Sequence, residues 1–191
     1  LALYVVLSEI GVIDKSELGS FGQFDSRLGG HPDRLKVPGV EASTGSLGHG
    51  MPVAAGIALA KQIQGSEGRV VTLIGDGEAN EGTVWETALI AAHRHLENLV
   101  CIVDYNHSTD RALVLGSIAD KFAAFGWGVV EIDGHNPNEI EESLSHEKTA
   151  RPLAIIANTI KGKGVKAMEN NPAWHHAAPK MNEVENLLGG I

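Results

Sequence analysis

Short apolar segments alternate with helix-like segments through the middle of this chain, and this alternation restricts the fold more than any other sequence feature. The runs RVVTLI, LVCIVD, GVVEID and PLAIIANTI are rich in strand-forming residues, whereas TVWETALIAAHRHL, SIADKFAAFG and NPNEIEESLS have helical periodicity. Strands that alternate with helices form parallel sheets, and strands buried on both faces are apolar along their length. We therefore predict an α/β fold with a doubly wound, mainly parallel sheet flanked by helices.

The chain has the length of one ordinary domain, with 191 residues of which 43% are hydrophobic. We predict a single domain over 1–191 with three regions. Residues 1–68 form an N-terminal helical region that contains the glycine turn TGSLGHG and the small-residue helix MPVAAGIALAKQI. Residues 69–160 form the alternating strand and helix core, and residues 161–191 form a loop and a C-terminal arm.

The charge and the cysteine content exclude several classes of protein. A net charge of -9 argues against nucleic acid or an anionic membrane surface as a partner. Cys101 is the single cysteine, so no internal disulfide can form and a cytoplasmic location is expected. Its place in LVCIVD predicts a buried strand residue. The apolar segment at the start of the chain is too short to span a bilayer. Because the chain begins with Leu1 and not with Met, we expect the chain to be part of a longer protein.

The segment GDG places Asp76 between Gly75 and Gly77 at the end of a predicted strand. These glycines allow an anion to approach the backbone, but the carboxylate would repel it unless a cation lies between them. Asn106 follows the next strand, at the same edge of a parallel sheet. Magnesium prefers such oxygen ligands. The pattern predicts a site for a metal and a diphosphate; a nucleotide site or plain turns remain alternatives, although Asn80 replaces a glycine of the dinucleotide fingerprint.

Five separate segments resemble the thiamine diphosphate-dependent transketolase family. GDGEANEGTVWETALIAAHRHLENLVCIVDYN is similar to its thiamine diphosphate signature, in which GDG is followed by an Asn after an apolar strand. TGSLGHG resembles its glycine turn, and HPDRLKVPGVEAS, IADKFAAFGW and NTIKGKGV recur in the expected order. The resemblance extends from residue 1 to about residue 180. It implies the thiamine diphosphate-binding fold, with thiamine diphosphate and Mg2+ as cofactors.

The resemblance also implies which residues hold the cofactors. Asp76 and Asn106 would bind magnesium, with the backbone carbonyl of Ser108 as a further ligand. The cofactor-binding residues would be Gly45, Ser46, Leu47, Gly75, Asp76, Gly77, Glu78 and Asn106.

Four residues are expected to act on the substrate or its chemistry. His31 matches a family position that contacts the hydroxyl groups of the sugar, and Glu81 matches a carboxylate at the subunit interface. The alternative for Glu81 is a purely structural role, in which its carboxylate interacts favourably with the dipole of the helix that follows. WHHAAP resembles a late active-site segment, in which His175, our preference, or His176 would reach the diphosphate and substrate. The alternative is that both histidines face solvent and have no role in the site.

Other positions depart from the family or lie outside its site. Ser46 stands where the family has Pro, His49 stands where it has Gln, and HSTDRA replaces the usual run after Asn106. His93 and His95 lie two residues apart on a predicted helix and cannot face one zinc ion, so surface or packing roles are expected.

The resemblance implies a split transketolase. The family's catalytic glutamate belongs to a pyrimidine-binding domain, which we expect a second polypeptide to supply. We therefore expect the partner to be a pyrimidine-binding C-terminal subunit, and the assembly to be a heterotetramer. The expected reaction is transfer of a two-carbon ketol unit from a ketose to an aldehyde, with small sugars or sugar phosphates as substrates.

Several alternatives stay open. They are a 2-oxo-acid dehydrogenase, a deoxyxylulose phosphate synthase, a nicotinamide dinucleotide-binding oxidoreductase and a degenerate, non-enzymatic binding subunit. The stretch HPDRLKVPGVEASTGSLG favours transketolase over the other thiamine diphosphate enzymes.

Overall fold

The computed structural model describes residues 1–145 and 150–189, so residues 190–191 of the expected C-terminal arm lie outside the described residues. The chain forms two compact units, Leu1–Gly50 and Met51–Ile191. The assignment of the whole chain to a single domain with three regions stays a prediction.

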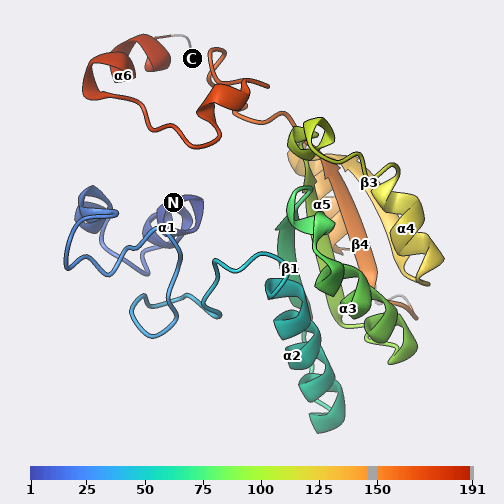
Figure 1. The fold of residues 1–191 in the computed structure, drawn as a ribbon. Coiled ribbons are helices and arrows are strands. Elements are labelled where there is room, and N and C mark those ends of the chain that lie inside the picture. The colour runs from blue at the N-terminus through green and yellow to red at the C-terminus, as the bar shows by residue number, and fades with distance from the viewer. Residues whose placement is uncertain (146–149, 190–191) are drawn as a thin grey trace. The chain divides into compact units, whose positions relative to one another are not determined.

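The second unit is built on one parallel sheet, as the alternating segments predict (Figure 1). Its strands are β1 (Val70–Gly75), β2 (Leu99–Tyr105), β3 (Gly128–Asp133) and β4 (Leu153–Asn158). Their order in the sheet is β1-β2-β4-β3, and each neighbouring pair is parallel. This parallel sheet confirms the predicted α/β fold. Because all four strands run in the same direction, their carboxyl ends lie at one edge of the sheet.

Helices cover both faces of this sheet. The helices α2 (Gly50–Gln64), α3 (Gly82–His93) and α4 (Ile118–Ala124) share a buried core with one face. The helix α5 (Pro137–Ser145) packs on the opposite face through Ile140 and Leu144. Successive strand residues point to opposite faces, so one strand supplies both cores. The buried residues of the larger core include Met51, Ala54, Ala58, Val84, Ala88, Cys101, Val103, Ile118, Phe122 and Ile156.

Two helix starts follow from local capping chemistry. The Asn136 side-chain oxygen accepts a hydrogen bond from the Asn138 N–H at 3.1 Å, and Pro137 occupies the first position of α5. The Ser117 hydroxyl accepts from the Asp120 N–H at 3.0 Å at the start of α4. Asn136 and Ser117 therefore cap the starts of α5 and α4.

The end of α3 corrects one prediction. The predicted helical segment runs through His95, but α3 ends at His93 and His95 has a positive φ of 49°. The chain turns here because Leu96 enters the core, where it is 1% exposed. His93 and His95 therefore do not share a helix, and both side chains are exposed, as expected for surface residues.

Cys101 lies in the core of the sheet, as its place in LVCIVD predicts. Burial away from water raises the pKa of its thiol, and the nearby charge of Glu78 adds to that effect. The thiolate is strongly disfavoured there, so this cysteine is a packing residue and not a nucleophile.

The first unit contains the helix α1 (Ala2–Glu9) and a 3-10 helix over Lys15–Ser20. The Tyr4 hydroxyl donates to the Gly29 carbonyl at 2.9 Å, which ties α1 to the segment just before His31. The buried core of this unit is formed by Tyr4, Leu7, Ile13, Leu28, Val37 and Val40.

The remaining elements are short. They are the 3-10 helices Glu78–Asn80, Ser108–Arg111 and Pro172–Trp174, and the helix α6 (Met181–Leu188). In the part of the chain that the structure describes, no helix combines the length and apolar character needed to cross a membrane.

Candidate functional site

The two residues expected to bind metal follow neighbouring parallel strands. Gly75, the last residue of β1, is paired with Asp104 in β2. The Asp76 N–H donates to the Asp104 carbonyl at 3.1 Å, which extends the strand pairing by one residue. Because both strands end at this edge, Asp76 and the segment after Tyr105 emerge side by side.

Asp76 is 2% exposed, and its carboxylate is held by the loop after β2. Oδ1 accepts hydrogen bonds from the Gly77 N–H at 2.9 Å and from the Ser108 hydroxyl at 3.2 Å. Oδ2 accepts from the Thr109 N–H at 3.2 Å. The Ser108 N–H in turn donates to Asn106 Oδ1 at 3.1 Å. These contacts bring Asp76, Asn106 and Ser108 together in one cluster.

A tight turn after β2 makes this cluster possible. His107 has a positive φ of 60°, an uncommon conformation for a residue with a side chain, and it starts the 3-10 helix Ser108–Arg111. The His107 ring lies 4.1 Å from the Tyr105 ring between centroids, and its Nδ1 lies 3.0 Å from Asp110 Oδ2. The segment HSTDRA thus turns back towards Asp76.

The donor set suits a hard divalent cation. It consists of the Asp76 carboxylate, the Asn106 amide oxygen and the Ser108 oxygens, and Mg2+ prefers oxygen ligands while it keeps positions for water and phosphates. A Cβ at Gly75 or Gly77 would meet no heavy atom within 4 Å, so the space at these two glycines is open. Among the described residues, no group of three or more His, Cys, Asp or Glu side chains could hold a metal. The residues present fit a magnesium ion that shares its coordination with a diphosphate.

Two acidic residues follow the GDG turn. Glu78 begins the 3-10 helix Glu78–Asn80 and is half-buried. Glu81 precedes α3 with an extended backbone, and its exposed side chain makes no capping hydrogen bond to that helix. The Asn80 side chain donates to the Thr109 hydroxyl at 2.7 Å, which joins this short helix to the loop after β2.

His175 and His176 follow the 3-10 helix Pro172–Trp174 and are exposed. Their ring centroids lie 4.4 Å apart, with the rings nearly perpendicular. The positive charge of Lys161 lowers the pKa of His175, and partial desolvation and His176 act in the same direction. The Asp76 carboxylate opposes this shift. His175 is therefore neutral at neutral pH and can accept a proton.

The other predicted cofactor residues lie in the first unit. Gly45 has φ 134°, and a Cβ built on it would lie 2.9 Å from Cγ of His31, so the glycine is required where the chain packs against that ring. Ser46 Oγ lies 3.1 Å from Nδ1 of His49, so the two residues that depart from the family's turn contact each other. Leu47 is 59% exposed.

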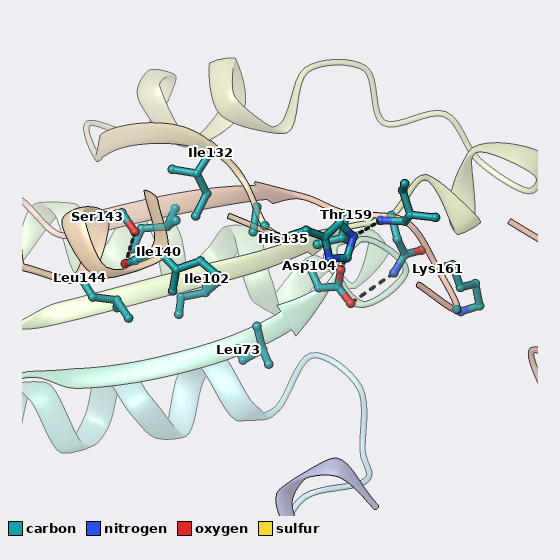
Figure 2. Close-up of a pocket in the computed structure, with 16 residues that line it drawn as sticks. Leu73, Ile102, Asp104, Ile132, His135, Ile140, Ser143, Leu144, Thr159 and Lys161 are labelled. Carbon is teal, nitrogen blue, oxygen red and sulfur yellow. Dashed lines mark hydrogen bonds between the residues drawn. The ribbon is translucent and has the colours of Figure 1, made fainter. Parts of the chain in front are cut away.

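A pocket of about 400 Å³ lies between the sheet and α5, beside the cluster of Asp76, Asn106 and Ser108 (Figure 2). Its floor is apolar and includes Leu73, Ile102 and Ile140. Its polar end is lined by Asp104, Asn106, His135, Thr159 and Lys161.

Sequence reasoning missed three side chains of this region: Asp104, Thr109 and Thr159. Asp104 could have been recognised from the sequence, because it is a charged residue at the end of an apolar strand. Thr109 and Thr159 could not, because their contacts join segments far apart in the chain.

Comparison with known proteins identifies the family. Residues 1–189 match the family described as transketolase, thiamine diphosphate binding domain. One of the subunits of the apulose-4-phosphate transketolase of Actinobacillus succinogenes is 42% identical over an alignment of 191 positions, and the match covers 97% of this chain and 69% of that protein. The 6-deoxy-6-sulfo-D-fructose transketolase subunit of a Clostridium species is 38% identical over an alignment of 182 positions, and the match covers 92% of this chain and 66% of that protein.

A solved structure agrees with these relatives. Transketolase from Pichia stipitis, in complex with sedoheptulose-7-phosphate, has a TM-score of 0.83 and 28% identity, and the match covers 90% of this chain and 28% of that one. The alternatives outside the transketolases are not favoured by these findings. The chain belongs to the transketolase family and contains its thiamine diphosphate binding domain.

Proposed function

We propose that this chain is the subunit of a split transketolase that holds the diphosphate of thiamine diphosphate and Mg2+. With a separate pyrimidine-binding subunit, it transfers a two-carbon ketol unit from a ketose to an aldehyde. The observation that carries the proposal is the cluster of Asp76, Asn106 and Ser108 at the ends of β1 and β2.

The metal is held by Asp76, Asn106 and the backbone carbonyl of Ser108. Its charge offsets the repulsion between Asp76 and the two phosphates. The open space at Gly75 and Gly77 supports an approach of the diphosphate to the backbone there, with Glu78 close by.

The thiamine ring supplies the carbanion chemistry when it is bound, and the protein orients the reactants. Gly45, Ser46 and Leu47 contact the cofactor, and His31, packed against Gly45, binds hydroxyl groups of the sugar.

The neutral imidazole of His175 accepts or returns a proton at the substrate, and His176 orients the substrate or the diphosphate. Glu81 contributes its carboxylate at the interface with the second subunit. The exposure of Glu81 and the lack of a capping bond from it to α3 support that role.

The names of the relatives support a partner subunit. Two of them are subunits of transketolases that act on apulose-4-phosphate or on 6-deoxy-6-sulfo-D-fructose. We propose a heterotetramer with two copies of each chain, which acts on small sugars or sugar phosphates. A cytoplasmic location agrees with the single, buried cysteine.

Calorimetric titration tests this function. Thiamine diphosphate with Mg2+ is titrated into the chain alone and into its mixture with the candidate pyrimidine-binding subunit. We expect tight, magnesium-dependent binding only in the mixture, lost in Asp76→Ala and retained in Asp120→Ala, a matched change at an exposed residue of α4. Binding of NAD without magnesium, or no binding in any mixture, would contradict the proposal.

A further inference from the structure

Asp104 contacts both residues whose side chains are expected to bind the metal, Asp76 and Asn106. Its backbone carbonyl accepts the hydrogen bond from Asp76 described above. Its carboxylate Oδ2 accepts from Asn106 Nδ2 at 3.3 Å, and Oδ1 accepts from the Thr159 hydroxyl (Figure 2). Within the described residues, no Lys, Arg or His side chain forms an ion pair with Asp104.

The contact with Asp104 determines which way the Asn106 amide faces. A carboxylate only accepts hydrogen bonds, so it attracts the amide nitrogen of Asn106 and repels the amide oxygen. Oδ1 is consequently directed away from Asp104 and accepts from the Ser108 N–H. An amide oxygen has two lone pairs, so one remains for a cation.

Thr159 holds Asp104 in turn. Its N–H donates to the Tyr105 carbonyl at 3.1 Å, which joins the chain after β4 to the end of β2. Its hydroxyl occupies Oδ1 of Asp104, so the other carboxylate oxygen faces Asn106. The result is a chain of three side chains, Thr159, Asp104 and Asn106.

We propose that Asp104 is a positioning residue that keeps the Asn106 oxygen available to the metal, and that Thr159 fixes the orientation of Asp104. This inference rests on the proposed function. Groups that orient metal ligands in this way typically change metal affinity by about 10- to 100-fold when they are removed.

The test uses Mn2+ as a paramagnetic probe, because manganese accepts the same oxygen ligands. Its dissociation constant is measured by electron paramagnetic resonance in the full complex with thiamine diphosphate and the partner subunit. We expect about 10- to 100-fold weaker binding in Asp104→Ala and a smaller loss in Thr159→Val. Thr159→Ser keeps the hydroxyl and is expected to bind like the unchanged protein.

Thermal unfolding of the metal-free variants separates positioning from a purely structural role. In that role Asp104→Ala and Thr159→Val would lower the melting temperature and leave Mn2+ affinity unchanged, which would overturn the inference. If Asp104→Ala does not fold, Thr159→Val and Thr159→Ser are compared by the same two measurements. Equal Mn2+ affinity in these two variants would then overturn the inference. An unchanged protein that binds neither Mn2+ nor thiamine diphosphate would refute the proposed function itself, and this inference with it.

Discussion

The ionisation of His175 depends on the charged groups around it. The Lys161 ammonium repels a second positive charge, which disfavours the imidazolium and lowers the pKa of His175. We expect an NMR titration of the His175 ring protons to give a pKa below that of a histidine in an unstructured peptide. In Lys161→Gln the pKa should rise, because the neutral amide removes the repulsion.

Lys163→Gln is the matched control for this titration, since Lys163 lies in the same exposed loop and does not contribute to the shift. A His175 pKa that is equal in the Lys161→Gln and Lys163→Gln variants would rule out Lys161 as its main cause. The direction of this shift matters for function. At pH values between the lowered pKa of His175 and the pKa of a free histidine, His175 is neutral and can act as a base, whereas a free histidine would be protonated.

The short 3-10 helix after the GDG turn depends on α3 for its position. The Trp85 ring in α3 donates from Nε1 to the Ala79 carbonyl at 2.8 Å, and it packs against Phe122 of α4 at 5.2 Å between ring centroids. Ala79 is fully buried, so the loss of this donor would leave its carbonyl poorly satisfied.

Trp85→Phe should therefore lower the free energy of unfolding by about 1 to 3 kcal/mol, since it removes the donor and keeps an aromatic ring. Urea denaturation followed by circular dichroism measures this change. Trp174→Phe, in the short 3-10 helix Pro172–Trp174, is the control and should change stability little. Equal stability of the two variants would mean that the hydrogen bond from Trp85 does not hold the turn.

At the scale of the whole molecule, we expect the two inner strands of the sheet to be the most stable part. The strands β2 and β4 each have two neighbours, and Leu153–Ala157 are all buried. Amides in such strands exchange with solvent only through large-scale opening, whereas amides in edge or loop-rich regions exchange through local opening.

Hydrogen exchange followed by mass spectrometry should accordingly show the slowest exchange in β2 and β4 and faster exchange throughout Leu1–Gly50. Within the described residues, that first unit has no strand and a small core. Protection in the first unit equal to that of β2 and β4 would show that its stability does not follow from its own packing.

Local chemistry explains why much of the fold was predictable. Apolar runs, helical periods and the cap at Asn136 act over a few neighbouring residues, so they can be recognised before the tertiary structure is known. Asp76 and Asn106 were recognised for a related reason: in a parallel sheet, residues that end successive strands emerge at one edge.

The sequence by itself therefore determined the parallel α/β architecture and the residues at the strand ends. The tertiary structure alone decided the position of β4 between β2 and β3, and the contacts of Asp76 with Thr109 and of Asp104 with Thr159. These contacts span 33 and 55 residues. Their geometry depends on strand order and on the path of two loops, neither of which is encoded in any short stretch of residues.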